Sequence, residues 1–245
     1  MTDYLIGTSG WSYEHWIKKF YPEKLKKTEW IRFYSRHFNT AELNMSFYRF
    51  PPAKTLKAWY KKLPGDFSMT FKGNRLITHR KKLHDVNDLV KKFYDICSAM
   101  KRKQGCFLWQ LPPSMEKNEH NLEKLGKFLD VMDKRKKNAI EFRDRSWWSK
   151  EVYDMLEDNN VGFVVVSGLD MPSVVKVTSD LAYFRFHGPG GAYSSKYNDK
   201  QIKSWAKKIK KAGRGCKEVY CYFNNDANAY AVDNAETLKK ELNVK

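Results

Sequence analysis

The stretch Asn138-Ala-Ile-Glu-Phe-Arg-Asp-Arg-Ser-Trp-Trp148 places a carboxylate and a guanidinium two residues apart in a predicted buried strand. Alternate residues of a strand face the same side of a sheet. Glu141 and Arg143 are therefore expected to project together, with Ile140 and Phe142 on the opposite face. A buried ion pair is costly to desolvate unless it has further partners. The stretch thus indicates either a functional site or a structural bridge, and both require polar groups from other strands.

Seven further runs have the length and apolar content of buried strands, and most end at a glycine, a proline or a polar residue. With 138–143, the predicted strands are residues 4–8, 40–44, 67–72, 105–111, 161–167, 181–187 and 218–223. Helical spacing of apolar residues predicts helices over 28–37, 51–63, 86–100, 121–132, 149–159, 199–211 and 228–242. Thr28 is the expected N-cap of the first helix.

The alternation of strands and helices predicts a parallel α/β sheet. Eight such units in 245 residues match a single-domain (β/α)8 TIM-type barrel covering residues 1–245. An open doubly wound sheet is the alternative, but neither GxGxxG nor GxxxxGK[ST] follows any predicted strand. Residues 167–180 are too few for a full crossover helix, so an irregular or missing helix is expected between strands 6 and 7.

The chain carries 46 Lys and Arg against 28 Asp and Glu, a formal net charge of +18. This excess favours a polyanionic partner such as nucleic acid, although lysines that solubilise a helical exterior would give the same composition. The four cysteines have no CxxC spacing and are predicted to be reduced core thiols. With no signal-peptide pattern and no long apolar run, we expect a cytoplasmic protein that does not interact with membranes.

Function in a barrel concentrates where the strands end at the carboxyl face. The predicted catalytic residues are Glu141, His187 and Glu42, because carboxylates with separated pKa values and a histidine titrating near neutrality suit acid/base chemistry. Each of these residues also has a purely structural alternative, in which the glutamates are neutralised by Arg143 or Arg185 and the histidine is only hydrogen-bonded.

Other polar and aromatic residues near the strand ends are predicted to bind an anionic substrate, with Arg143 and Arg185 as the clamp. They are Trp11, Asn44, Tyr48, Lys72, Gln110, Arg143, Trp147, Arg185 and Asn224. No cofactor is predicted. A divalent metal held by Glu42, Glu141 and His187 is a minor alternative, because the chain has no HxH, HxxxH or HExxH spacing.

Several segments carry a family pattern in order along the chain. They are Ile6-Gly-Thr-Ser-Gly-Trp-Ser-Tyr13 with Trp16 and Phe20-Tyr-Pro22, Glu42-Leu-Asn44 through Phe47-Tyr-Arg49, Lys72 with Ile77-Thr-His79, Gln110-Leu-Pro-Pro113, Glu141-Phe-Arg143 with Ser146-Trp147, Arg185-Phe-His-Gly188, and Phe223-Asn-Asn225 with Ala231 and Asn234-Ala235. In these segments the chain resembles, over nearly its full length, the YecE-like family of domain-of-unknown-function proteins, family seventy-two, which are TIM barrels.

The resemblance implies the fold and the location of the site, and it brings no reaction with it. The implied fold is also similar to the endonuclease-IV and xylose-isomerase barrels. This chain lacks their sets of metal-binding histidines, so a borrowed metal-dependent mechanism has no support.

The leading hypothesis is a barrel enzyme that acts on an anionic, phosphate-containing substrate, such as a nucleotide or nucleic acid, by acid/base catalysis. The alternatives are a non-catalytic nucleic-acid-binding protein and a sugar-phosphate isomerase or hydrolase. The sequence does not indicate an oligomeric partner.

Overall fold

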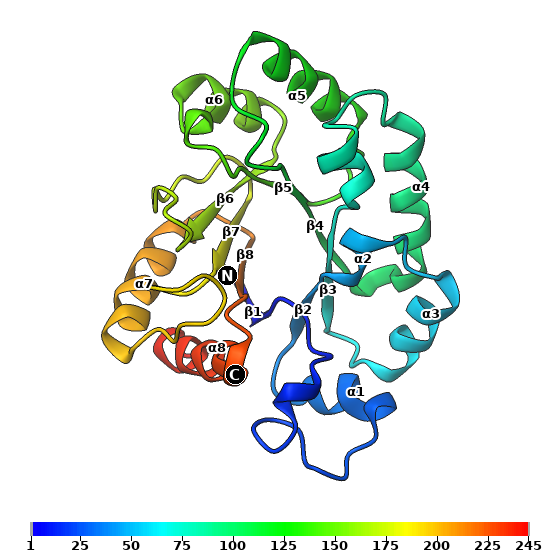
Figure 1. Ribbon diagram of the computed structural model, residues 1–245, viewed down its shortest axis with the longest axis vertical. Coiled ribbons are helices and arrows are strands. Elements are labelled where there is room, and N and C mark those ends of the chain that lie inside the picture. The colour runs from blue at the N-terminus through cyan, green and yellow to red at the C-terminus, as the bar shows by residue number, and fades with distance from the viewer. Residues whose placement is uncertain (1, 245) are drawn as a thin grey trace.

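Eight parallel strands form the inner wall of the molecule, and the helices surround them in the computed structural model, which describes residues 2–244 (Figure 1). The strands are β1 (Asp3–Thr8), β2 (Thr40–Leu43), β3 (Ser68–Lys72), β4 (Gln104–Gln110), β5 (Asn138–Glu141), β6 (Gly162–Ser167), β7 (Leu181–Phe186) and β8 (Glu218–Phe223). The α-helices are α1 (Trp30–Tyr34), α2 (Met45–Tyr48), α3 (Ala53–Lys62), α4 (Asn87–Cys97), α5 (Glu119–Val131), α6 (Lys150–Asp158), α7 (Asp199–Ala212) and α8 (Tyr230–Leu242). The predicted TIM-type α/β barrel is confirmed.

The eight predicted strands all occur, with ends that differ by no more than two residues. The helix predicted over 28–37 begins later than expected. Thr28 lies inside a 3-10 turn (Lys27–Glu29), and α1 begins at Trp30 without a side-chain cap. The backbone carbonyl of Thr28 accepts a hydrogen bond from Lys62 instead. The connection from β6 to β7 contains no helix, as expected from its length.

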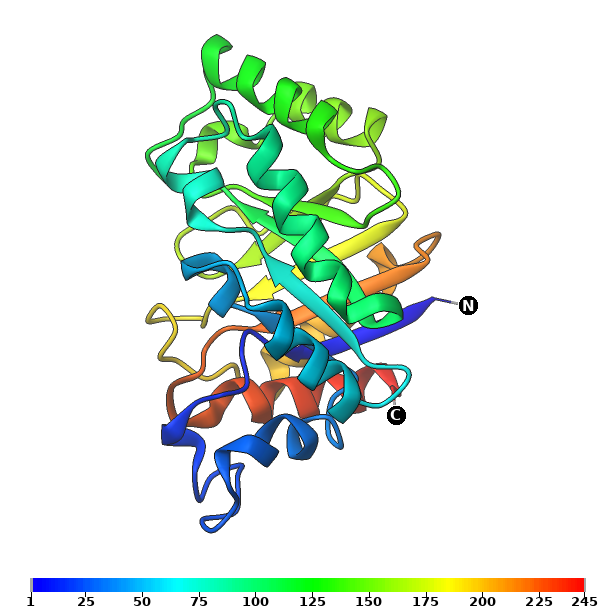
Figure 2. The ribbon, with the colours of Figure 1, turned by 90° about the vertical axis from the view of Figure 1, so that its right-hand side faces the viewer.

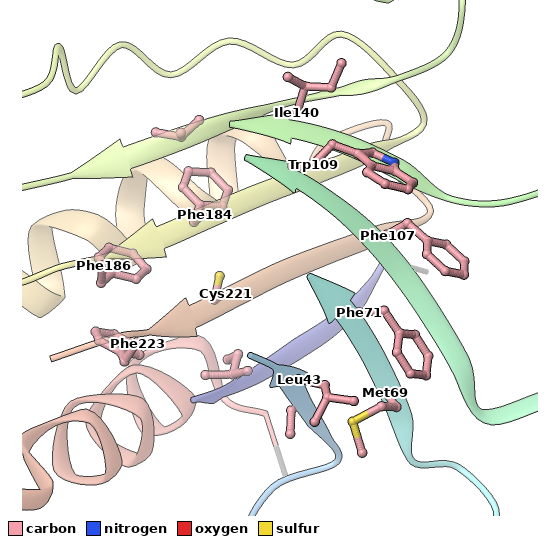
Figure 3. Packing of buried hydrophobic residues seen from close by; sticks show 14 of the residues in the cluster. Leu43, Met69, Phe71, Phe107, Trp109, Ile140, Phe184, Phe186, Cys221 and Phe223 are labelled. Atoms are coloured by element: carbon pink, nitrogen blue, oxygen red, sulfur yellow. The ribbon is translucent and has the colours of Figure 1, made fainter. Parts of the chain in front are cut away.

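The outward faces of the strands carry large apolar side chains that pack under the helices (Figure 3). Aromatic rings on neighbouring strands stack there, with Phe71 and Phe107 centroids 5.7 Å apart and Phe186 and Phe223 centroids 4.4 Å apart. The inward faces form a smaller cluster of aliphatic and tyrosine side chains: Leu5, Leu108, Val164, Val166, Leu181, Tyr183, Tyr220 and Tyr222. This division follows the two-residue period of the strands.

The ring closes between β1 and β2, where a tyrosine hydroxyl and a single bridge stand in place of a regular ladder. In the bridge Ser9 pairs with Glu42, and the Gly10 N–H donates to the Glu42 carbonyl oxygen at 2.8 Å. The Tyr34 hydroxyl accepts from the backbone N–H of Thr8 at 2.9 Å and donates to the carbonyl oxygen of Thr40 at 3.1 Å. A Cβ atom at Gly7 would lie 2.3 Å from that same Thr40 oxygen. Glycine therefore permits the close approach of the two strands, and Tyr34 joins their backbones.

All strands run in one direction, so their carboxyl ends meet at one side of the barrel. In the side view, the N-terminus lies at one end and the loop that follows β7 lies at the other (Figure 2). No helix within residues 2–244 is both long and apolar enough to cross a membrane.

We expect Tyr34→Phe to lower the free energy of unfolding by about 1–3 kcal/mol, because it leaves buried backbone groups of β1 and β2 without a partner. Urea denaturation of the variant measures the change. Tyr60→Phe is the matched control, since the Tyr60 hydroxyl makes no hydrogen bond with the residues that the structure describes. Equal effects of the two substitutions would show that Tyr34 does not hold the seam.

Candidate functional site

One guanidinium links two carboxylates across the inside of the barrel. Arg185 on β7 donates from Nε and Nη2 to Glu42 on β2, at 3.0 and 2.6 Å. Its Nη1 donates to Glu141 on β5 at 2.6 Å. All three side chains are fully buried. The structural bridge that the sequence left open is therefore present and occupies the guanidinium of Arg185.

Glu42 has both of its oxygens occupied by protein donors. Besides Arg185, the Ser9 hydroxyl donates to Oε1 at 2.8 Å and the Tyr183 hydroxyl donates to Oε2 at 2.7 Å. A carboxylate with this many donors is held in one position and has no oxygen left for a ligand. We therefore assign Glu42 a structural role and do not retain it as a proton-transfer residue.

Glu141 lies between Arg185 and Arg143, as the sequence predicts from the strand period. Its Oε1 accepts a hydrogen bond from Arg143 Nε and lies 3.8 Å from His187 Nε2. Burial raises the pKa of Glu141, but Arg143 and Arg185 outweigh burial and hold that pKa well below its usual range. Glu141 is thus a fixed negative charge at neutral pH rather than a proton donor.

Arg143 follows β5 and is the least buried member of this network, with 12% of its side chain exposed. Its Nη2 lies 3.4 Å from Gln110 Oε1 and 3.5 Å from His187 Nε2, both long contacts. Its Nη1 makes no hydrogen bond within residues 2–244. Arg143 can therefore offer donors to a ligand, which Arg185 cannot do without losing a carboxylate.

His187 follows β7 and is buried between Arg143 and Asn224. The Asn224 amide nitrogen lies 3.3 Å from Nδ1, while Arg143 Nη2 faces Nε2. Burial and then the nearby Arg185 lower the pKa of His187 well below its usual value. The imidazole is neutral at physiological pH and can exchange hydrogen bonds with a ligand.

Lys72 ends β3, and its ammonium has no hydrogen bond or ion pair among the described residues. The nitrogen lies 4.3 Å from the centroid of the Phe47 ring, a cation–π contact. Burial and then Arg185 lower the pKa of Lys72 to about 7, against the opposing effect of Glu141 and Glu42. Near neutral pH this amine is present in both protonation states.

A cavity of about 650 Å³ opens at the carboxyl ends of the strands. It is lined by Tyr13, Asn44, Met45, Phe47, Tyr48, Arg49, Lys72, Tyr193, Asn224 and Asp226. Tyr48 and Tyr193 are 64% and 40% exposed. The side-chain oxygen of Asn44 is buried and has no hydrogen-bond partner within residues 2–244. The cavity thus presents a buried acceptor and the amine of Lys72 between aromatic walls.

Four predicted substrate-binding residues line this cavity: Asn44, Tyr48, Lys72 and Asn224. Asn224 joins the cavity to His187, and Arg143 in turn contacts His187, Gln110 and Glu141.

The structure does not bring the other two aromatic candidates to the cavity. Trp11 is buried against Trp59, with ring centroids 5.1 Å apart. Trp147 stacks on Phe142 at 4.8 Å and donates its indole N–H to the Met115 carbonyl oxygen at 2.6 Å. Both rings belong to the core around the barrel, so we withdraw them as substrate-binding residues.

Asp226 lines the cavity and was not predicted from the sequence. Burial raises the pKa of this carboxyl, and its Oδ2 lies 3.5 Å from His15 Nε2. The available signal is the polar run Asn224-Asn225-Asp226 directly after the last strand. Phe47, which contacts the Lys72 amine, follows β2 on the short helix α2.

A second cavity, also of about 650 Å³, lies at the opposite ends of the strands and includes Asp3, Ser68, Gln104 and Glu218. It has no counterpart of the buried Arg185 network. We therefore place the candidate site at the carboxyl ends, as is usual for barrels of this kind. Within residues 2–244, no group of three or more His, Cys, Asp and Glu side chains is arranged to hold a metal ion. The four cysteines are buried thiols.

Comparison with known proteins gives a consistent result. The model of a family described as "Protein of unknown function DUF72" matches residues 5–245. The chain is 26% identical to the UPF0759 protein YunF of Bacillus subtilis (strain 168), over 98% of this chain and 94% of that protein. It is 29% identical to the UPF0759 protein YecE of Escherichia coli (strain K12), over 59% of this chain and 50% of that protein. The crystal structure of a DUF72 family protein from Thermotoga maritima superposes with a TM-score of 0.91 at 30% identity, covering 98% of this chain and 99% of the other.

We expect Glu42→Gln to lower the free energy of unfolding by about 3–5 kcal/mol, because it leaves the buried Arg185 charge undercompensated. Denaturation in urea measures this loss. Glu123→Gln, which breaks an exposed pair with Lys127, makes the same change of atoms at the surface and should have little effect. Similar stabilities of the two variants would mean that the internal network does not stabilise the barrel.

Proposed function

Because the chain belongs to the DUF72 family, whose model names no activity, we propose its function from its own site: an enzyme acting on an anionic, phosphate-containing substrate at the carboxyl end of the barrel. The observation that carries this proposal is a pair of cationic groups with unused donors: Lys72, which lines the aromatic-walled cavity, and Arg143, which contacts His187 next to the cavity residue Asn224.

The charge balance of the network supports an anionic ligand. Glu42 and Glu141 compensate two positive charges, whereas Arg185, Arg143 and the protonated form of Lys72 supply three. A ligand anion would supply the missing negative charge in a partly buried setting, where uncompensated charge is costly. A guanidinium with a free edge suits phosphate or carboxylate oxygens.

The rest of the cavity favours a ligand with a planar or sugar portion. Tyr48 and Tyr193 offer exposed ring faces, which stack well on bases and sugars. The unpaired oxygen of Asn44 would accept a hydrogen bond from a hydroxyl or an amino group. A nucleotide or a sugar phosphate combines these features with the anion.

Proton exchange in this proposal falls to Lys72, with His187 as a hydrogen-bonding partner. A catalytic acid or base works best when its pKa lies near the working pH, and Lys72 meets this condition. Glu141 keeps its charge and would orient Arg143. The reaction class that fits these groups is an isomerisation or a hydrolysis.

The net charge of +18 favours a second candidate, a nucleic-acid-binding protein without catalysis. This function would depend on the whole basic surface rather than on Arg143. Its affinity for an oligonucleotide would fall steeply between 50 and 200 mM salt, as counterions are released on binding.

We expect Arg143→Gln to weaken the binding of at least one ligand among inorganic phosphate, ribose 5-phosphate and adenosine 5′-monophosphate by roughly tenfold, about 1.4 kcal/mol. NMR titration of the folded protein measures the dissociation constants. Arg135→Gln is the control with the same change of charge, because Arg135 is exposed on the loop before β5, at the other end of the barrel. If none of the three ligands binds, or if Arg143→Gln binds them as well as the wild type, the proposal is wrong. Salt-sensitive oligonucleotide binding without turnover would then favour the second candidate.

We also expect the contribution of Lys72 to phosphate binding to depend on pH. Its ammonium form dominates below a pKa of about 7 and is lost as the pH rises through that value. The affinity of the wild type for ribose 5-phosphate, divided by that of Lys72→Met, should therefore be largest near pH 6 and approach one near pH 8.5. Because both proteins bind the same ligand, the effect of the ligand's own ionisation on affinity cancels in this ratio. A ratio that stays constant over this range would contradict the role given to Lys72.

A further inference from the structure

The backbone and side chain of Lys72 are held in place by the short helix α2, which follows β2. The Ser46 hydroxyl lies 2.6 Å from the Lys72 carbonyl oxygen, and the Ser46 carbonyl accepts from the Asn74 amide at 2.9 Å. The next residue of the helix, Phe47, contributes the ring beside the amine. Lys72 is thus a positioned side chain at the wall of an open cavity, not a freely moving surface lysine.

The amine of the half-buried Lys72 differs from that of the buried lysine Lys103. The Lys103 ammonium donates to the carbonyl oxygens of Tyr60 and Leu63, both at 2.6 Å. It is therefore capped by the backbone and lies away from the cavity. The Lys72 nitrogen has no such acceptor within residues 2–244, so its lone pair, once the proton is lost, is free to react.

Charged groups on several strands face Lys72 and set its protonation. Burial is the largest effect and favours the neutral amine, as do Arg185 and Arg143, whereas Glu141 and Glu42 favour the ammonium. Burial and then Lys72 lower the pKa of His79, which follows β3, to about 4, so this imidazole is uncharged at neutral pH. A substantial neutral fraction makes a lysine a nucleophile at physiological pH.

We propose that Lys72 forms a Schiff base with the aldehyde or ketone group of an anionic substrate whose charged group is bound by Arg143. This inference rests on the proposed function for the anion and adds the chemical class of the substrate, a carbonyl compound such as a phosphorylated sugar in its open-chain form.

The step balances without any further reactant. The neutral Nζ attacks the carbonyl carbon, a C–N bond forms and the C=O π bond breaks, giving a carbinolamine after proton transfer from nitrogen to oxygen. Loss of the hydroxyl together with the remaining N–H proton releases one water and leaves the imine. Hydrolysis reverses these steps. The protonated imine withdraws electrons from the neighbouring carbon and acidifies its C–H bond, which is the requirement for isomerisation. Asp226, whose pKa is raised by burial, lines the same cavity and can carry the proton.

Reductive trapping tests the proposal. Dihydroxyacetone phosphate and sodium cyanoborohydride are added to the full chain at pH 7.5, and the products are analysed by intact mass and peptide mapping. We expect one adduct per chain at Lys72, formed at least about tenfold faster than at any other lysine, because ordinary lysines with a pKa near 10.4 are almost fully protonated at this pH.

Lys72→Met should lose this adduct, whereas Lys208→Met, at an exposed position of α7, should keep it. The map of the wild-type chain does not depend on the folding of either variant. Labelling of Lys72 at the rate of the surface lysines would overturn the proposal.

A second probe separates this inference from the proposed function. Dihydroxyacetone has the same carbonyl group without the phosphate. Fast labelling of Lys72 by both probes at equal concentrations, unchanged by Arg143→Gln, would support the reactive amine and contradict the anion site. Phosphate binding that depends on Arg143, without trapping at Lys72, would support the anion site and contradict the Schiff base. We expect the phosphorylated probe to label at roughly tenfold lower concentration, and Arg143→Gln to remove that advantage.

Discussion

The contact of Arg185 with both Glu42 and Glu141 is the constraint on which the inside of the barrel depends. One planar guanidinium reaches carboxylates on two other strands, β2 and β5, which a lysine with a single ammonium could not do in the same geometry. Because the three groups are fully buried, none of them can exchange its partner for water. Glu141 is thereby held in the charged state that orients Arg143, and the fixed charges act on Lys72 and His187 through a medium that screens weakly.

This network divides the strand-end residues into two groups with different exposure. The inner group is Arg185, Glu42 and Glu141, whose polar atoms all have protein partners. It supplies fixed charges in fixed positions. The outer group, which includes Lys72 and Arg143, retains donors or lone pairs that protein atoms do not use. The unused groups, rather than the ion pairs themselves, are what favour a chemical function.

The residues that the sequence predicts well are those governed by the period of a strand. Glu141 and Arg143 lie on one face because they are two residues apart in and just after β5, and the apolar runs mark all eight strands. Sequence position near a strand end does not fix the direction of a side chain in a loop, which is why Trp147 stacks on Phe142 instead of reaching the cavity. The saturation of Glu42 depends on donors from β1 and β7, far apart in the chain, and α2 is too short to give a periodic pattern. These features arise only from the tertiary structure.

The pairing of β1 with β8 has a consequence for how the protein acquires its structure. Asp3 pairs with Glu218, so the hydrogen-bonding partner of the first strand is synthesised long after the strand itself. Contacts between such distant segments require a large loss of chain entropy and slow the final assembly of a fold. Until then β1 would be held only on the side of β2, through Tyr34 and the single bridge between Ser9 and Glu42 rather than a full ladder. The apolar run Leu5-Ile6 would meanwhile be open to chaperones or to other chains, and the ring can close only after β8 has been synthesised.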